Sequence, residues 1–315
     1  MKRFLRPLGP VFALALLLAR PDLSFQGALD GLLLWYRVVL PTLLPFLLCS
    51  SLLISWGGVP YLLAPLRPLT SRLGLSADGA YALLAGLLCG YPMGARTTAD
   101  LMRRGAVSGR EGRFLLAVCS CPSPMFLAGY IRPRLDPSVS FSLFLTAIYL
   151  PLILIGLVLR LAGRRFADPE SAGAEPLFSE TDSETPPVDL VLMDCLELMA
   201  RIGGYLMLYS VLAAYAAGLL PELLRGPVCG LFEMTTGIRQ IAETWDGAPQ
   251  AALIAACAAF GGLSGVSQTN AVIKNAGLSI RHYVFWKLIH AGLALLILIL
   301  PSCCPGPAVP PVPAL

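Results

Sequence analysis

Long stretches without a charged residue constrain this chain more than any other feature of its sequence. Most of them approach or exceed the roughly 20 apolar residues that a helix needs to cross a bilayer. A mean hydropathy of +0.73 and a charged share of 13% are also outside the range of soluble domains. The sequence therefore predicts an all-α polytopic membrane protein. The uncharged stretches are 38–66, 79–95, 114–131, 137–159, 202–221, 247–273 and 288 onward.

The two halves of the chain repeat one pattern. In each half an aspartate and an arginine stand seven residues apart ahead of an uncharged run, and a Cys-Gly pair follows. A Ser-containing break in an apolar stretch comes about thirty residues later. Duplicated halves with interrupted helices are typical of secondary transporters, so we expect an inverted repeat with broken or re-entrant helices. The pairs are Asp30/Arg37, Asp194/Arg201, Cys89-Gly90 and Cys229-Gly230.

Composition divides the chain into five expected segments. We interpret the first as a membrane helix or anchor, because no convincing small-x-small cleavage site for a signal peptide follows its apolar core. Residues 168–187 carry six acidic residues and no basic one, which favours a mobile linker. The segments are 1–26, a first half at 27–163, an acidic linker at 164–187, a second half at 188–301 and a Pro-rich tail at 302–315.

Four shorter segments are too polar for ordinary membrane spans. Residues 27–36 and 188–199 mix charged residues with Leu and Trp, so we expect them to lie along the membrane interface. The stretches 61–75 and 221–237 contain polar and helix-breaking residues, and we expect re-entrant or half-membrane elements there.

The densest motif begins at Cys89. Its Gly-Tyr-Pro-x-Gly sequence interrupts a helix and exposes backbone amides, and Arg96 adds a permanent positive charge. Amides and a guanidinium at membrane depth make an anion site. Alternatively, Arg96 ends a helix and extends to the interface. The candidate binding residues are Gly90, Tyr91, Pro92, Gly94, Arg96 and Thr97.

Three other breaks place polar side chains in apolar runs. Small residues also mediate helix packing in membranes, which explains the glycines near Ser264 but explains Gln268 and Asn270 less well. If Glu233 lies within the membrane, we expect its carboxylate to bind a coupling ion or a donor group of the substrate. The alternative is that Glu233 occupies a solvated loop. The candidates are Ser120, Ser123, Glu233, Thr235, Thr236, Ser264, Ser267, Gln268 and Asn270.

Several chemistries are not expected. The sequence has no P-loop, no Gly-x-Ser-x-Gly elbow and no His-Glu-x-x-His motif, so we do not expect an enzyme. The cysteines lie mostly in apolar runs without metal-ligand spacing, so neither a metal nor an organic cofactor is expected. The positive charge is too dispersed for nucleic-acid binding. The coupling ion stays open, and a homo-oligomer is compatible with the sequence.

Five motifs in order and spacing resemble a known family. They are Leu40-Pro-Thr-Leu-Leu-Pro-Phe46, the 90–96 motif, Gly203-Gly204, the 230–237 segment and the 261–268 segment. Over about residues 27 to 300 the chain resembles the YlbJ-like sporulation integral membrane proteins of the nucleoside-recognition or Gate domain group. This resemblance implies two Gate-type repeats, similar to parts of concentrative nucleoside transporters, and a role in endospore formation. One member of the group looks to be the transporter of dipicolinic acid across the outer forespore membrane, which implies that membrane as the location.

Dipicolinate, a planar dicarboxylate, is compatible with these residues. Arg96 suits bidentate carboxylate binding, and Tyr91 offers a ring neighbour. Two alternatives stay open. A transporter of nucleosides or other small metabolites would depend more on Glu233 than on Arg96. A non-transporting partner in the sporulating cell would tolerate substitutions at the breaks. The other donors in the dipicolinate hypothesis are the 90–94 amides, Ser123, Thr235, Ser264 and Gln268.

Overall fold

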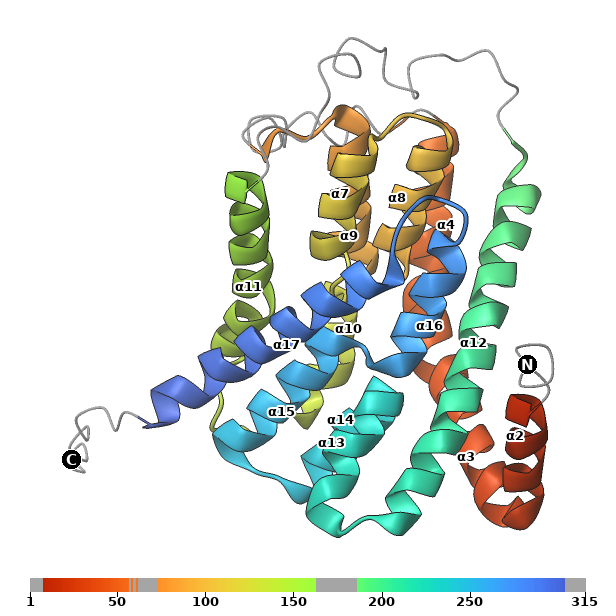
Figure 1. Cartoon of the computed structure of the whole chain (residues 1–315), viewed down its shortest axis with the longest axis vertical. Coiled ribbons are helices and arrows are strands. Elements are labelled where there is room, and N and C mark those ends of the chain that lie inside the picture. Colours follow the sequence, from red (N-terminus) through yellow and green to blue (C-terminus); the bar gives the residue numbers. More distant parts are fainter. Residues whose placement is uncertain (1–7, 57, 59–60, 62–72, 163–185, 304–315) are drawn as a thin grey trace, which may run out of the picture.

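A computed structural model of the chain describes residues 8–56, 58, 61, 73–162 and 186–303, and its regular elements there are helices (Figure 1). Five helical stretches in this part are long and apolar enough to cross a membrane, which confirms the predicted all-α membrane class. Most of the acidic linker, most of the 61–75 stretch and nearly all of the tail lie outside the described residues. The candidate spans are Pro21–Leu53, Phe141–Leu161, Val188–Leu219, Gly247–Ile273 and Ile280–Leu300.

The described helices follow one another closely. Two π-helical turns, η1 and η3, and one 3-10 turn, η4, interrupt the α-helical geometry. In chain order the elements are α2 (Leu8–Ala19), α3 (Pro21–Leu34), η1 (Trp35–Val39), α4 (Leu40–Ser55), α7 (Ala77–Cys89), α8 (Met93–Arg103), α9 (Gly109–Val118), α10 (Pro124–Phe126), η3 (Leu127–Ile131), η4 (Arg132–Arg134), α11 (Phe141–Ala162), α12 (Val188–Leu219), α13 (Glu222–Phe232), α14 (Met234–Thr244), α15 (Gly247–Phe260), α16 (Gly262–Ile273) and α17 (Ile280–Cys303).

The expected interfacial pieces at 27–36 and 188–199 are instead parts of long helices. α3 continues through η1 into α4, and α12 runs without a break for 32 residues. Gly27 and Gly31 let the backbones of α3 and α12 approach. A Cβ atom at either glycine would lie 2.8 Å from a Cα atom of α12, at Val211 and Met207 respectively. This close backbone packing joins α3 to the second half of α12.

Helix interruptions divide the rest of the chain into paired short helices. α7 ends at Gly90 and α15 ends at Gly261, both with positive φ, which glycine adopts without strain. Ser123 caps α10, since its hydroxyl accepts a hydrogen bond from the Phe126 amide at 3.2 Å. Glu233 separates α13 from α14. The predicted breaks therefore coincide with real helix ends.

Two of these pairs fold back as hairpins, α7 with α8 and α13 with α14. The first pair lies in the upper half of Figure 1 and the second in the lower half. Both pack glycine against glycine: a Cβ at Gly94 would lie 2.8 Å from the Gly86 Cα, and one at Gly237 would lie 2.2 Å from the Gly230 Cα. Close backbone contact of this kind is a common way of joining helices in membranes.

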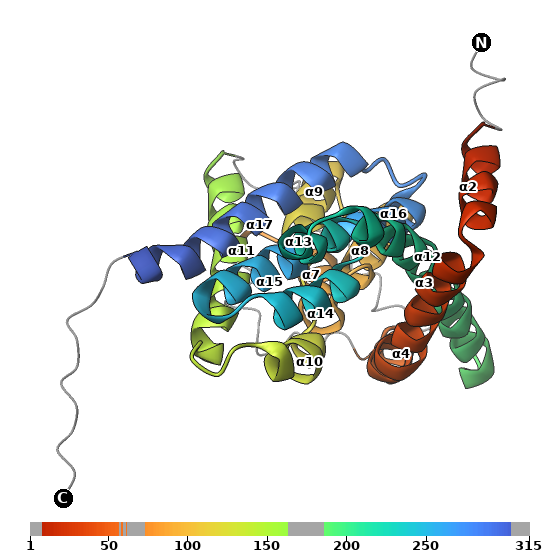
Figure 2. The same ribbon diagram turned by 90° about the horizontal axis from the view of Figure 1, so that it is seen from below.

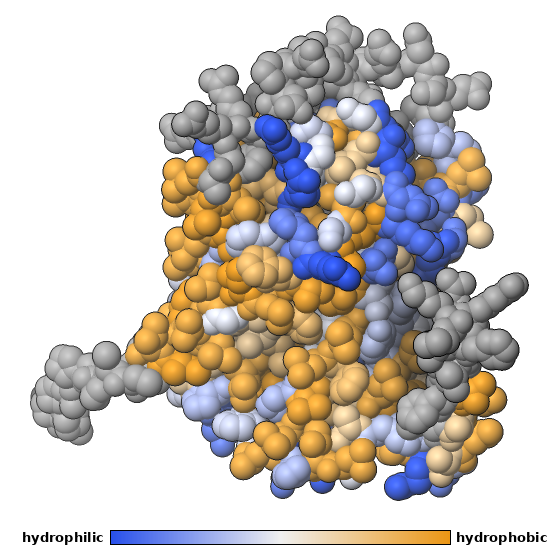
Figure 3. Space-filling model, viewed as in Figure 1, coloured by the Kyte–Doolittle hydropathy of each residue, from blue (hydrophilic) through white to orange (hydrophobic). Residues whose placement is uncertain are grey.

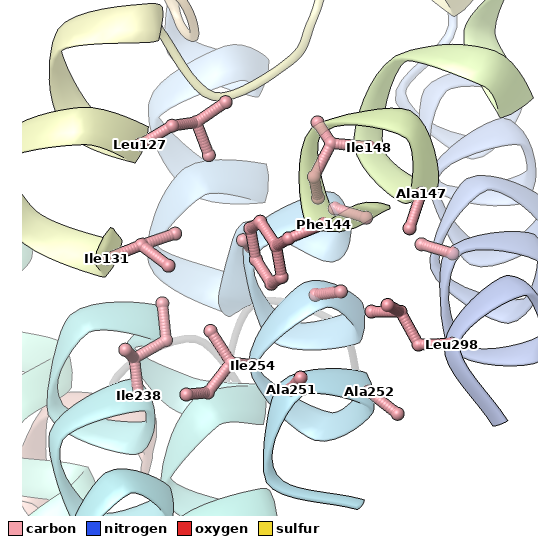
Figure 4. Packing of buried hydrophobic residues seen from close by; sticks show 14 of the residues in the cluster. Leu127, Ile131, Phe144, Ala147, Ile148, Ile238, Ala251, Ala252, Ile254 and Leu298 are labelled. Carbon is pink, nitrogen blue, oxygen red and sulfur yellow. The ribbon is translucent and has the colours of Figure 1, made fainter. Parts of the chain in front are cut away.

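The main apolar core joins the two halves. Figure 4 shows Phe144 of α11 among side chains from η3, α14 and α15, including Ile131, Ile238 and Ile254. In Figure 2 the same helices surround the centre of the molecule, while α2 and α3 lie to one side. Large apolar side chains are exposed along α11, and apolar residues cover much of the face in Figure 3. Such an exterior suits lipid rather than water.

The glycine contact in the lower hairpin generates a stability prediction. Gly237→Ala is expected to lower the thermal midpoint in detergent, because the added Cβ meets backbone atoms that cannot rotate away. Overpacking of this kind costs about 1–3 kcal/mol. Gly204→Ala is the control, since nothing lies within 4 Å of a Cβ there. Equal midpoints for the two variants would contradict the hairpin packing.

Candidate functional site

The four helix interruptions meet around one small cavity, with about 60 Å³ of room for water-sized molecules. The long helices α4 and α12 and the end of η1 complete its wall. We call it the central cavity. Its volume in this conformation suits a few water molecules, so a larger ligand requires the wall to open. Its lining residues are Val39, Thr42, Leu43, Cys89, Gly90, Tyr91, Pro122, Ser123, Phe126, Ile202, Leu206, Glu233, Met234, Thr235, Gly261, Ser264, Gly265 and Gln268.

Tyr91 connects the interruptions to one another. Its backbone N–H donates to the Cys121 carbonyl at 3.1 Å, which joins the first break to the second. Its hydroxyl donates to the Ala258 carbonyl at 3.2 Å and contacts the Met234 sulfur, which joins it to the second half. A Cβ at Gly261 would lie 3.3 Å from the Tyr91 ring, so a small residue is needed there.

Glu233 is buried and caps α14. Its carboxylate accepts the Thr236 amide at 2.7 Å, the Thr235 amide at 3.1 Å and the Thr235 hydroxyl. Negative charge at a helix N-terminus is stabilised by the helix dipole and by the free amides of the first turn. This arrangement excludes the solvated-loop interpretation of Glu233, and it explains how the cavity wall tolerates a carboxylate.

Other polar side chains line the cavity from different elements. Gln268 donates from its amide nitrogen to the Ser264 hydroxyl at 3.0 Å, one turn away on α16. Thr42 donates to the Val38 carbonyl at 2.6 Å, where η1 passes into the proline-containing helix α4. A hydroxyl that bonds a backbone carbonyl near a proline replaces part of the lost helical hydrogen bonding.

Seven of the fifteen predicted site residues line the central cavity, namely Gly90, Tyr91, Ser123, Glu233, Thr235, Ser264 and Gln268. The others lie nearby or face elsewhere. Asn270 is exposed, and the Ser267 hydroxyl hydrogen-bonds that of Tyr209 at 2.5 Å. Gly94 and Thr97 are buried in α8, and Pro92 is the N-cap of that helix. The Thr236 amide donates to the Glu233 carboxylate. The Ser120 carbonyl accepts a hydrogen bond from Lys287.

Arg96 lies outside the central cavity, in a second hollow that we call the upper charged cavity. Its Nε atom is 3.8 Å from a carboxylate oxygen of Asp100. Helices α12 and α16 contribute residues to both hollows, whereas α8 lines only the upper one. The residues of the upper charged cavity are Arg96, Asp100, Arg103, Asp194, Glu197, Leu198, Arg201, Ala271 and Val272.

A lower charged cavity lies among elements in the lower half of Figure 1. Arg239 of α14 forms an ion pair with Asp30 of α3 across it, with 2.9 Å between nitrogen and oxygen. The two Asp/Arg pairs of the sequence repeat thus occupy different charged cavities. The lower cavity is lined by Asp30, Leu33, Leu34, Arg37, Val38, Tyr130, Arg134 and Arg239.

Lys287 was missed by the sequence reasoning. It lies on α17 with a 1% exposed fraction, and its ammonium group donates to the Ser120 carbonyl at 2.9 Å. The same group is 5.0 Å from the centroid of the Tyr91 ring. Tyr283, Lys287 and His290 share a helical face and are all buried, and this spacing was the available signal.

The fold and the polar central cavity define a multi-pass integral membrane protein. The chain is 27% identical over 325 residues to the sporulation integral membrane protein YlbJ of Bacillus subtilis (strain 168), covering 90% of this chain and 79% of that protein. It is thus a distant, nearly full-length homologue of a sporulation integral membrane protein. The relative's name states no enzymatic activity. No protein-family model and no solved structure match the chain.

The Glu233 cap generates a prediction for the site. In Glu233→Gln one acceptor oxygen is replaced by an NH₂ group that faces amide donors. Loss of a buried acceptor costs about 1–3 kcal/mol, so the thermal midpoint should fall by roughly 3–8 °C. Thr236→Val keeps the backbone donor and should change the midpoint much less. If Glu233→Gln matches the wild type, the cap is not structural.

Proposed function

We propose that the protein is a secondary transporter of a small carboxylate, with dipicolinate as its substrate in sporulating cells. The convergence of four helix interruptions on one cavity, lined by apolar residues with a few polar side chains among them, carries this proposal. Broken helices that meet at a midplane binding site are the general plan of secondary transporters. The homology to a sporulation membrane protein and the resemblance to the Gate group support the dipicolinate assignment and the outer forespore membrane as location.

The proposed architecture is an inverted repeat with two re-entrant hairpins. The order hairpin, broken helix and long helix occurs as α7–α8, α9–α10 and α11, and again as α13–α14, α15–α16 and α17. A 33-residue helical stretch precedes the first set and the 32-residue α12 precedes the second. The opposite placement of the two hairpins in Figure 1 supports the inversion.

The donors at the central cavity favour an anionic substrate. Helix α16 begins at the cavity wall without a side-chain cap, so its positive dipole end lies at the cavity. Hydroxyl and amide donors of Ser123, Ser264 and Gln268 add neutral hydrogen bonds. A flat dicarboxylate would place its carboxylates on these donors and its ring against Tyr91.

A nucleoside is the weaker candidate. Its sugar hydroxyls need acceptors, and Glu233 is the carboxylate in the described wall of the cavity. Both oxygens of Glu233 already accept hydrogen bonds from the first turn of α14. A non-transporting partner is disfavoured for another reason. Burying polar side chains around a cavity costs free energy, and a protein that binds no substrate there has no use for such a cavity.

We propose that the two charged cavities mark the ends of routes to the central cavity from opposite sides. In this arrangement the lower route is bridged between helices by the Asp30–Arg239 ion pair, whereas Arg96 pairs within its own helix. Arg96 and Arg239 have equivalent surroundings, Gly94-x-Arg96-x₃-Asp100 and Gly237-x-Arg239-x₃-Glu243. In the alternate state we expect Asp30 and Arg239 to separate, and Arg96 to pair with Asp194.

The transport proposal is tested by uptake into liposomes that contain the purified protein. Saturable uptake of dipicolinate, with little uptake of uridine, is the expected result. Gln268→Ala should raise the KM for dipicolinate about tenfold, which corresponds to the loss of one hydrogen bond of about 1.4 kcal/mol. Asn270→Ala on the same helix should behave as the wild type, because that side chain is exposed. Preferred uptake of uridine would refute the carboxylate assignment.

The bridging ion pair generates a second transport prediction. Asp30→Arg and Arg239→Asp should each slow uptake several-fold, because like charges then oppose closure of the lower route. The double charge swap should restore part of the rate. The control is Lys274→Glu, which reverses an exposed charge outside the three cavities. Additive losses in the double swap would show that the pair does not act as a gate.

A further inference from the structure

Lys287 is a buried cation that the proposed transport mechanism has not used. It is the eighth residue of the 24-residue helix α17, and its Nζ atom donates to the Ser120 carbonyl at 2.9 Å. Aromatic rings of Tyr91 and Tyr283 lie 5.0 and 6.0 Å from it, measured to the ring centroids. Within the described residues no carboxylate forms an ion pair with it.

A charge at this depth is costly unless its surroundings compensate for it. Two sources of compensation are present. α9 ends at Val118, so the negative end of its dipole and the carbonyls of the unwound residues that follow lie beside the ammonium. The faces of two tyrosine rings add cation–π attraction. The other titratable groups around Lys287 are the thiols of Cys119 and Cys121 and the ring of His290.

Unwound carbonyls and helix C-terminal ends are the ligands that hold a coupling cation such as Na⁺ in transporters with broken helices. Ser120 belongs to such an unwound segment, and its carbonyl already accepts a hydrogen bond from the Lys287 ammonium. The ammonium also lies behind Tyr91, whose ring forms part of the central cavity. α11, which takes the place of α17 in the first half, has no charged residue before Arg160.

We propose that the Lys287 ammonium takes the place of a coupling cation at the second helix interruption, so that substrate transport requires no Na⁺. The inference rests on the proposed function for its transport part. The fixed charge also offsets part of the substrate's negative charge through the wall formed by Tyr91. Lys287 is thus a positioning residue, because it acts through the Ser120 carbonyl and Tyr91 and not by contact with substrate.

The test uses the full-length protein in liposomes and in detergent. Wild-type dipicolinate uptake should be the same, within twofold, in NaCl and in choline chloride of equal ionic strength. Lys287→Gln should lower the rate at least tenfold, Lys287→Arg should recover part of it, and the exposed Lys274→Gln should match the wild type. Uptake that depends on Na⁺ in the wild type, or full activity of Lys287→Gln, overturns the inference and leaves the transport proposal intact.

A second readout separates the two proposals. The thermal midpoint of the wild type should not change when choline replaces Na⁺, whereas Lys287→Ala should gain stability in Na⁺ because its vacated carbonyl accepts the ion. If the wild type takes up no carboxylate, the transport proposal fails and the midpoints alone decide the inference. A wild-type thermal midpoint that rises with Na⁺ overturns the inference about Lys287. If Lys287→Ala does not fold, Lys287→Gln is measured in its place. A thermal midpoint of the folded variant that does not change with Na⁺ also overturns the inference.

Discussion

Backbone groups at the ends of helices must find partners inside this protein, because lipid offers none. Three of the interruptions solve the problem with a side chain or backbone group from the same break, another break or another helix. The Tyr91 amide uses the Cys121 carbonyl, the first amides of α14 use Glu233, and the Ser120 carbonyl uses Lys287. The contacts that make the broken helices tolerable are therefore the same contacts that build the central cavity.

The same contacts place two opposite charges, Glu233 and Lys287, at two helix ends. Within the described residues these two side chains form no ion pair with each other. Glu233 compensates the positive end of α14, and Lys287 compensates the negative end of α9. Tyr91 lies between the two, with its hydroxyl directed to the second half and its ring facing Lys287. Because Tyr91 also lines the central cavity, it connects the cavity physically with both helix ends.

Much of the fold was predictable from the sequence. Five of the uncharged runs overlap the five candidate spans, whereas those at 79–95 and 114–131 are divided into shorter helices. Gly90, Ser123, Glu233 and Gly261 marked helix ends, because glycine, serine and carboxylates at those positions have local reasons to end or cap helices. The pieces expected at the membrane interface are parts of long helices. Local composition did not indicate this, because the packing of α3 on α12 at Gly27 and Gly31 is a tertiary contact.

The composition of the site was harder to predict than the positions of the breaks. Sequence spacing does not tell which face of a helix points inward, so Gln268 lines the cavity while Asn270, two residues later, is exposed. Arg96 lies one turn beyond the break on α8 and reaches a different hollow. Lys287 was overlooked because a single lysine at the edge of an apolar run resembles the end of a span, although its whole helical face is buried.

The hydrogen bonds between the halves have a consequence for biosynthesis. Tyr130 in the first half donates to the Thr235 carbonyl at 2.9 Å, and Tyr91 donates to the Ala258 carbonyl. Until the ribosome has made the second half, these hydroxyls and the apolar surface around Phe144 have no native partners. The nascent first half must therefore wait in the membrane as an incomplete assembly, in which insertion factors and proteases meet its polar breaks before the remaining helices arrive.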